Sequence, residues 1–248
     1  MIKVGLIGYG KAGMAVARVL ASTPGVRLCW IAKRQIPSAV DAWTVEGVPL
    51  ISLTAATLEQ TLQCHPVDAL VDFSSAAALH IYGELVRQRQ LMLVTAISAY
   101  GEDDQWYLQD LGRDTRIMAS PNITLGINFL ILAARLLRGI APFADVEIIE
   151  QHFREKPEIS GTARKIAASL SVEEERITSL RLGGIVGQHE VVFGFPHQTV
   201  RLTHDSIRRE AFGTGAAFAL QELARRPNGF YTFDDLLMQK IREGLLAG

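Results

Sequence analysis

Three glycines near the N-terminus lie between two short apolar segments, and this arrangement restricts the fold more than any other feature of the sequence. Residues 3–7 are nearly all apolar, the stretch GYGKAG follows at once, and a second apolar segment occupies residues 26–32. Between them, residues 14–21 carry apolar side chains at helical spacing. A strand buried on both faces, a tight turn, a helix and a second strand explain this order. The chain therefore begins as a βαβ unit of a parallel sheet.

The spacing of these glycines matches GxGxxG, which in a βαβ unit is typical of dinucleotide binding. The first glycine permits the tight turn, the second lets the backbone approach a pyrophosphate, and the third lets the helix pack closely on the strand. The pyrophosphate would lie at the helix N-terminus. A purely structural turn is the alternative. The residues expected to contact the dinucleotide here are Gly8, Gly10, Lys11, Ala12, Gly13 and Met14.

The end of the second strand carries Lys33 and Arg34, where NAD-binding proteins place an acidic residue that accepts from the ribose 2′-hydroxyl. Two cations would instead pair with a 2′-phosphate. The sequence therefore predicts a preference for NADPH, with NADH as a possible second cofactor. The alternative is a solvated basic loop tip.

More strand and helix units follow along the first half of the chain. Residues 69–73 and 91–95 are apolar strand candidates, and residues 58–63 and 76–89 have helical patterns. The order predicts a doubly wound sheet, in which ligands bind beyond the carboxyl ends of the strands. The cofactor-facing residues expected from these strand ends are Phe73, Ser74, Thr95, Ala96 and Ile97.

The pattern changes at the stretch SPNITLGIN, whose Asn122 we add to the expected cofactor contacts. A helical segment at 125–138 precedes strand candidates of antiparallel character, which occupy residues 145–152, 178–184, 189–195 and 198–204. The predicted fold is α/β, a Rossmann-type doubly wound parallel sheet with an inserted α+β domain. We expect residues 1–121 and 208–248 to form the dinucleotide-binding domain and residues 122–207 the substrate-binding domain.

The stretch EQHFREKPEISGTARKIAASL combines several groups that could act on a substrate. His152 could donate a proton near neutral pH, and Lys156 supplies a cation. Ser160, Gly161 and Thr162 introduce a helix, whose N-terminus can hold a carboxylate. Taken singly, each is more often a surface, solvated or capping group. Together with a hydride donor, they fit the reduction of a conjugated imine or enamine that carries carboxylates.

The same stretch resembles the EhHHxxKxDAPSGTA signature of the 4-hydroxy-tetrahydrodipicolinate reductase (dihydrodipicolinate reductase) family. The resemblance extends over most of the chain, through GYGKAGMAVA, VDFS, SPNITLGIN, GGIVGQHEVVF and LTHDSIRREAFGTGAAFAL. It implies hydride transfer from NADH or NADPH to a cyclic dicarboxylate in lysine and diaminopimelate biosynthesis. It also implies a central domain whose sheet builds a homotetramer. By this resemblance His152 is the proton donor, Lys156 the catalytic lysine, and Ser160, Gly161 and Thr162 the carboxylate-binding residues.

The sequence departs from the family pattern at three places close to the expected substrate. Phe153 stands where the family has a second histidine, and Glu158 and Ile159 stand in a loop one residue shorter than the family's. TAIS, residues 95–98, replaces the family's GTTG. Phe153 has no hydrogen-bonding atom for a carboxylate, so one anchor of a dicarboxylate is weakened or replaced by apolar contact.

Charge, apolar-segment length, and cysteine and histidine spacing argue against several other classes of protein. Lys and Arg total 25 against 26 Asp and Glu, a net charge of -1, and no basic run suggests nucleic-acid binding. The apolar stretch 125–134 is too short to span a bilayer, and the N-terminus lacks a signal-peptide pattern. Two cysteines outside any CxxC motif indicate a reducing, cytoplasmic setting. The histidines show no ligand spacing, so we expect no metal.

Three functions remain open at this point. The first is the lysine-pathway reductase itself, acting on a small carboxylate substrate. The second is a divergent paralogue that reduces another cyclic imine, enamine or enone. The third is a non-catalytic NADPH-binding regulator, against which the presence of both His152 and Lys156 argues.

Overall fold

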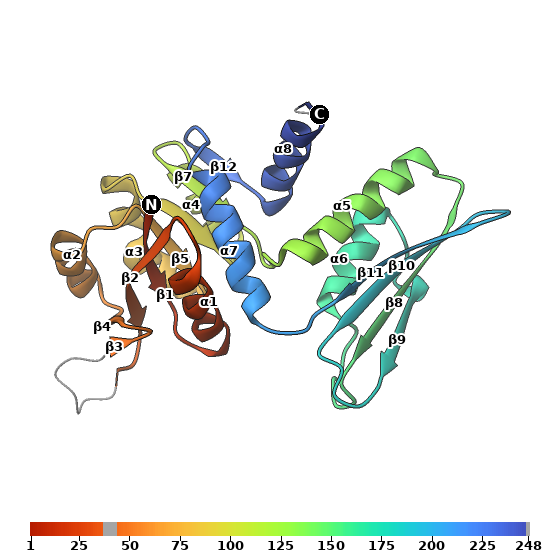
Figure 1. Ribbon diagram of the computed structural model, residues 1–248, viewed down its shortest axis with the longest axis horizontal. Helices are drawn as coiled ribbons and strands as arrows, with labels where there is room; N and C mark the ends of the chain where they lie inside the picture. The colour runs from red at the N-terminus through yellow and green to blue at the C-terminus, as the bar shows by residue number, and fades with distance from the viewer. Residues whose placement is uncertain (37–43, 247–248) are drawn as a thin grey trace. The chain divides into compact units, whose positions relative to one another are not determined.

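The structure, a computed structural model, describes residues 1–36 and 44–246 and divides into two compact units (Figure 1). The first unit comprises Met1–Leu125 and Arg209–Gly248, and the second comprises Gly126–Arg208. Among the helices of the described ranges, none combines the length and apolar character that a membrane span requires.

The first unit is built on a sheet with the strand order β12-β7-β6-β5-β1-β2-β4-β3. Its strands are β1 (Ile2–Ile7), β2 (Val26–Lys33), β3 (Thr44–Val45), β4 (Val48–Ser52), β5 (Ala69–Asp72), β6 (Met92–Thr95), β7 (Arg116–Ala119) and β12 (Gly229–Tyr231). All neighbours pair in parallel except β3, which pairs antiparallel with β4 at the edge. The strand order reverses direction at β1, where ligands bind in doubly wound sheets.

Helices accompany this sheet because each parallel connection must return the chain to the same end. They are α1 (Lys11–Ser22), α2 (Ala55–Cys64), α3 (Ala76–Gln88), α4 (Glu102–Leu111), α7 (Glu210–Leu223) and α8 (Phe233–Leu246). Every residue of β5 and β6 is buried, as expected for strands covered on both faces. The core between sheet and helices includes the fully buried Trp30 and Tyr82. The predicted Rossmann-type fold is confirmed.

The second unit is a four-stranded sheet with the order β11-β10-β8-β9. It contains α5 (Leu125–Ile140), β8 (Asp145–His152), α6 (Gly161–Leu170), the short helix η1 (Glu174–Arg176), β9 (Ile177–Arg181), β10 (Gln188–Gly194) and β11 (Thr199–Asp205). Apolar side chains of α5 and α6 pack with those of β8 and β10 in one core. The alternating burial along β8 and β10 shows that one face of this sheet turns toward that core.

One strand of this unit differs from the expectation of antiparallel pairing. The strand expected at 178–184 is β9, which ends at Arg181 and runs parallel to β8. The reason is the intervening α6, because a helix crossover between two strands brings the chain back in the same direction. The other pairs, β8 with β10 and β10 with β11, are antiparallel as expected.

Candidate functional site

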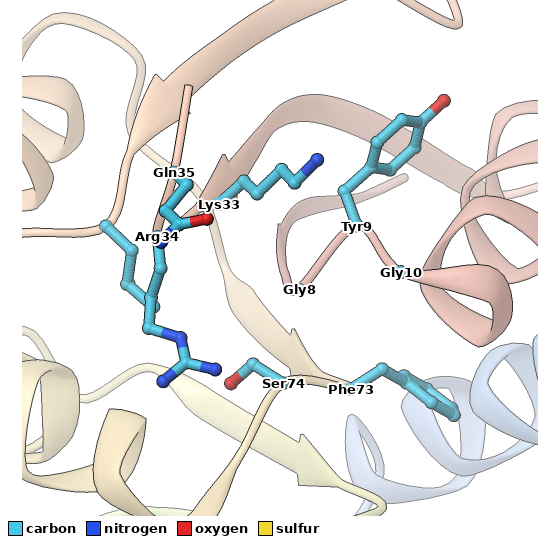
Figure 2. A pocket seen from close by; sticks show the side chains of 9 residues that line it. Gly8, Tyr9, Gly10, Lys33, Arg34, Gln35, Phe73 and Ser74 are labelled. Atoms are coloured by element: carbon cyan, nitrogen blue, oxygen red, sulfur yellow. The ribbon is translucent and has the colours of Figure 1, made fainter. Parts of the chain in front are cut away.

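A cavity of about 470 Å³ lies at the carboxyl ends of β1, β2 and β5 in the first unit (Figure 2). It lies where the strand order reverses, the position expected for a nucleotide in this fold. Its lining includes six of the residues expected to bind the cofactor and three others, and comprises Gly8, Tyr9, Gly10, Lys33, Arg34, Gln35, Leu53, Phe73 and Ser74.

The three glycines of the turn have the geometry that their spacing predicts. Gly8 has a φ of 94°, and a Cβ there would lie 2.7 Å from the backbone of Phe73. A Cβ at Gly13 would lie 2.1 Å from the Gly8 carbonyl oxygen, so only glycine permits this packing of α1. A Cβ at Gly10 would have no described atom within 4 Å, which leaves open space beside the first turn of α1. A pyrophosphate fits this turn.

Lys33 and Arg34 follow at the end of β2 and line the same cavity. Figure 2 shows the Arg34 guanidinium reaching toward the Ser74 hydroxyl, while the Lys33 ammonium lies on the side of Tyr9. The described lining thus contains two cations at the place where the ribose of a dinucleotide is read.

A second cavity of about 350 Å³ adjoins the first, because Phe73 and Ser74 line both. Ala12, Ala96 and Ile97 line it as well, as expected from the sequence. Residues from farther along the chain complete it, and they comprise Ser75, Ala76, Ser98, Ala99, Pro121 and Phe212. Phe212 belongs to α7, and only the folding of the C-terminal segment back into the first unit brings it to this cavity.

A buried carboxyl group holds the loop between the two cavities. Asp72, the last residue of β5, accepts hydrogen bonds from the Ser74 amide at 2.8 Å, the Ser74 hydroxyl at 2.6 Å and the Tyr82 hydroxyl at 2.6 Å. Burial raises the pKa of Asp72 to about 6, although these hydrogen bonds act in the opposite direction. The network fixes Ser74 in the wall of both cavities.

The remaining residues expected at the cofactor lie nearby but are absent from the described lining of these cavities. Lys11, Gly13 and Met14 lie in the first turn of α1. Thr95 is buried and its hydroxyl lies 2.8 Å from that of Tyr100. Asn122 accepts hydrogen bonds from the amide and hydroxyl groups of Thr124.

In the second unit, His152 ends β8 beside a fully buried carboxylate. Its Nδ1 lies 2.5 Å from Oε2 of Glu150, two residues earlier on the strand. Burial alone would raise the pKa of Glu150, but hydrogen bonds from Arg181, Ser179, His152 and the Ser160 amide lower it to about 2. Glu150 is therefore ionised.

Ser160 lies directly before α6 and contacts the same cluster. Its hydroxyl lies 2.8 Å from Nε2 of His189, and among the described residues it makes no capping bond to α6. Burial lowers the pKa of His189 to about 4, and the neighbouring His152 adds to this effect. Gly161 and Thr162 form the first turn of α6. Because the Ser160 side chain makes no capping bond within the described part of the chain, it does not satisfy the first backbone amides of α6.

Phe153 and Lys156 lie in the loop between β8 and α6. Phe153 is 41% exposed, so a substantial part of this large apolar residue is open to solvent. Lys156 is half-buried, its amide donates to the Phe153 carbonyl, and its own carbonyl accepts from Nε of Arg181. The structure thus brings His152 and Ser160 together through Glu150, and ties Lys156 to them through Arg181.

Glu150, Arg181 and His189 were not among the residues singled out from the sequence. Two signals could have found Glu150: the family signature begins with a glutamate at this position, and residues two apart on a strand share a face, which places Glu150 beside His152. Arg181 and His189 come from β9 and β10, and only the strand pairing brings them to β8. Within the described ranges, no group of three or more metal-ligating side chains is present.

Comparison with known proteins agrees with this architecture over nearly the whole chain. Residues 2–123 match the family profile described as dihydrodipicolinate reductase, N-terminus, and residues 122–237 match the profile described as dihydrodipicolinate reductase, C-terminus. Curated relatives named 4-hydroxy-tetrahydrodipicolinate reductase include that of Myxococcus xanthus, 27% identical over 96% of this chain and 98% of its own. The Caldanaerobacter subterraneus protein is 28% identical over 92% of this chain and 94% of its own.

Among solved structures, the dipicolinate-bound dihydrodipicolinate reductase of Paenisporosarcina sp. TG-14 superposes with a TM-score of 0.80. It is 21% identical and the match covers 94% of this chain and 97% of that one, so it supports the fold. The two profiles together account for both units of the structure. The chain therefore belongs to the dihydrodipicolinate reductase family and is an NAD(P)H-dependent oxidoreductase.

Proposed function

We propose that this protein is a 4-hydroxy-tetrahydrodipicolinate reductase of lysine and diaminopimelate biosynthesis. The supporting observation is the cluster at the end of β8, where His152 pairs with Glu150 and Ser160 stands at the start of α6. A histidine that can give a proton and a helix N-terminus that can hold a carboxylate are what a reductase of a cyclic imine or enamine acid needs. The relatives that carry this name align with almost the full chain.

The residues take the following roles in this proposal. Residues 1–121 and 208–248 bind the nicotinamide cofactor, and residues 122–207 bind the substrate. The bound cofactor supplies a hydride to one atom of the conjugated system. His152 gives a proton to the other atom of the conjugated system. Hydride and proton together convert the substrate to the reduced product, and the cofactor leaves in its oxidised form. Lys156, Ser160, Gly161 and Thr162 hold the carboxylates by charge and by backbone and hydroxyl hydrogen bonds.

The cofactor contacts proposed are those of the turn, the end of β2 and the loops after β5 and β6. They are Gly8, Gly10, Lys11, Ala12, Gly13, Met14, Lys33, Arg34, Phe73, Ser74, Thr95, Ala96, Ile97 and Asn122. NADPH is the preferred cofactor in this proposal, because Lys33 and Arg34 are the charged groups in the described lining of the first cavity.

Purified protein tests the substrate directly. With NADPH and 4-hydroxy-tetrahydrodipicolinate, we expect loss of NADPH absorbance that depends on both enzyme and substrate, and loss of this activity in His152→Ala. A wild-type protein that binds NADPH but does not turn over this substrate would contradict the proposal.

The exposed Phe153 favours one alternative, a paralogue that reduces a different cyclic imine, enamine or enone. A phenyl ring cannot hydrogen-bond to a carboxylate, so a substrate without that carboxylate would fit equally well. Phe153→His separates the two cases. Gain of activity toward 4-hydroxy-tetrahydrodipicolinate only in this variant would favour the paralogue, whereas full activity of the wild type favours the reductase.

We also propose a cytoplasmic homotetramer, because the family pattern implies the tetramer and two cysteines outside any CxxC motif fit a reducing compartment. In the second unit, α5 and α6 cover one face of the sheet, and the other face carries the half-buried Ile149 and Val192. Pairing of that face with another copy would bury these side chains. Light scattering should give four times the chain mass of 27.2 kDa.

A further inference from the structure

Glu150 occupies the centre of the proposed substrate site without itself being open to a ligand. The residue is fully buried, and all its contacts come from the second unit. Its Oε1 accepts from the Ser160 amide at 3.2 Å, the Ser179 hydroxyl at 2.7 Å and Nη2 of Arg181 at 2.8 Å. Its Oε2 accepts from Nη1 of Arg181 at 3.0 Å and lies 2.5 Å from Nδ1 of His152.

These contacts determine which nitrogen of His152 carries a hydrogen. An ionised carboxylate can only accept hydrogen bonds, so the His152 Nδ1 must be the donor in this pair. In the neutral ring the other nitrogen, Nε2, is then unprotonated, and Nε2 is the atom that gains or gives a proton. Two arginine hydrogen bonds keep the Glu150 carboxylate ionised and fix its plane.

The surroundings of Nε2 agree with a role in proton exchange. Gly187, just before β10, lies against this atom, since a Cβ built there would be 3.0 Å from Nε2. The missing side chain leaves space on that side of the ring. His189 packs against His152 edge to face, with ring centroids 5.3 Å apart, and restricts rotation of the imidazole.

Arg181 also hydrogen-bonds to the loop that carries Lys156. Its Nε donates to the Lys156 carbonyl at 3.0 Å, and Nη2 donates to the Glu158 carbonyl at 2.8 Å. One guanidinium therefore connects Glu150 to the loop, and Glu150 connects it to His152 and Ser160. A buried ion pair adds little net stability once desolvation is counted, whereas removal of one partner is strongly destabilising, so the folding of each variant must be checked.

We propose that Glu150, held by Arg181, is a positioning residue that locks His152 in the Nδ1-protonated tautomer and directs Nε2 toward the substrate. The role of Nε2 as the proton donor rests on the proposed function, whereas the tautomer follows from the contacts of Glu150 alone. Carboxylates that orient a metal-ligating imidazole commonly change affinity or activity by about 10- to 100-fold when altered, and we expect an effect of at least this size here.

The tautomer can be observed without any substrate. In protein with 15N-labelled histidine, long-range proton-nitrogen spectra distinguish the two ring nitrogens, and a His152→Gln variant assigns the signals. We expect neutral His152 in the wild type to show a protonated Nδ1 and a free Nε2. A protonated Nε2, or a mixture of tautomers, in the wild type would overturn the proposal even if every variant failed to fold.

The substitution Glu150→Gln removes the charge while nearly preserving the shape. We expect kcat to fall by about 10- to 100-fold, with the KM for NADPH unchanged, and the His152 signals to shift toward the other tautomer. Glu174→Gln is the matched control, because Glu174 pairs with Arg164 on the surface of the same unit at 3.0 Å. This control should keep both kcat and the His152 signals of the wild type.

The two readouts separate this inference from the proposed function. If the wild type does not reduce 4-hydroxy-tetrahydrodipicolinate but shows the Nδ1-protonated tautomer that Glu150→Gln loses, the positioning role stands and the substrate assignment fails. If the wild type is active and folded Glu150→Gln keeps both its kcat and its tautomer, the positioning role is wrong.

Discussion

At the scale of single residues, access to His152 Nε2 depends on the absence of a side chain at Gly187. This glycine is buried and adopts no left-handed conformation, so its requirement is one of space and not of backbone freedom. The neighbouring Gly184, in the same loop, is exposed, and a Cβ at that position would have no described atom within 4 Å. The two positions therefore form a natural pair for substitution.

We predict that Gly187→Ala lowers kcat/KM by about 10- to 100-fold, because a methyl group 3.0 Å from Nε2 displaces either the imidazole or the substrate. Steady-state kinetics with NADPH would measure it, and circular dichroism would confirm that the variant is folded. Gly184→Ala should retain wild-type kinetics. Equal activities of the two variants would show that the space beside Nε2 is not used.

The proposed preference for NADPH can also be tested at single residues. We predict that the double substitution of Lys33 and Arg34 by Ala raises the KM for NADPH by about 10- to 100-fold, because charge-assisted hydrogen bonds to a phosphate are lost. The KM for NADH should change little, since NADH lacks the 2′-phosphate. Arg27→Ala, at the opposite end of β2, is the control and should leave both constants unchanged. An equal rise of KM for both cofactors would contradict the proposal that Lys33 and Arg34 bind the 2′-phosphate.

At the scale of elements, the sequence pattern identified β1, β2, β5 and β6, because their apolar runs are continuous, but it named neither β7 nor β12. It missed α4, in which Leu108 and Leu111 are buried and acidic side chains fill the first turn. It also missed β4, which lies beside the edge strand β3 and is only partly buried. The parallel pairing of β9 escaped notice because the strand pattern alone does not encode direction, although the helix before it does.

The residues of the candidate site likewise divide into those that the sequence could indicate and those that it could not. The residues contributed by one continuous stretch, from His152 to Thr162, could be nominated from their spacing and from the family signature. Those contributed by other strands could not, because Arg181 and His189 reach the site only through sheet register. Phe212 likewise reaches its cavity through the return of α7 to the first unit.

The packing of α7 in the first unit is a further property of elements. A Cβ at Gly215 would lie 1.6 Å from the carbonyl oxygen of Ile123, in the backbone that follows β7. We predict that Gly215→Ala destabilises the protein by about 1–3 kcal/mol or more, as overpacking does. Thermal unfolding would show a lower Tm.

Gly244→Ala in α8 is the control for this substitution. No described atom lies within 4 Å of a Cβ at that position, and alanine is the better helix former by up to about 1 kcal/mol. Its Tm should equal or exceed that of the wild type. A Gly215→Ala variant with an unchanged Tm would mean that α7 can shift without cost.

At the scale of the whole molecule, the two units contain buried titratable groups of opposite behaviour. In the first unit the pKa of Asp72 is raised by burial to about 6, so its folded state binds a proton more readily than the unfolded chain. In the second unit burial lowers the pKa of His189 to about 4 and also lowers that of His204. There the unfolded chain binds protons more readily. Acidification should therefore stabilise the first unit through Asp72 and destabilise the second unit through His189 and His204.

We predict that lowering the pH from 7 to 5 decreases the protection of β8 and β10 against hydrogen exchange more than that of β5. As the pH falls below 6.5, the unfolded chain takes up a proton at His189 that the folded state does not, and the second unit loses stability. Protonation of Asp72 instead favours the folded first unit. Mass spectrometry of peptides from each strand would measure both units in one sample. Asp72→Asn should remove the compensating gain at β5 while leaving the response of β8 unchanged. Because each group acts within its own unit, a uniform loss of protection in the wild type, unaltered by Asp72→Asn, would show that these groups do not control the acid response.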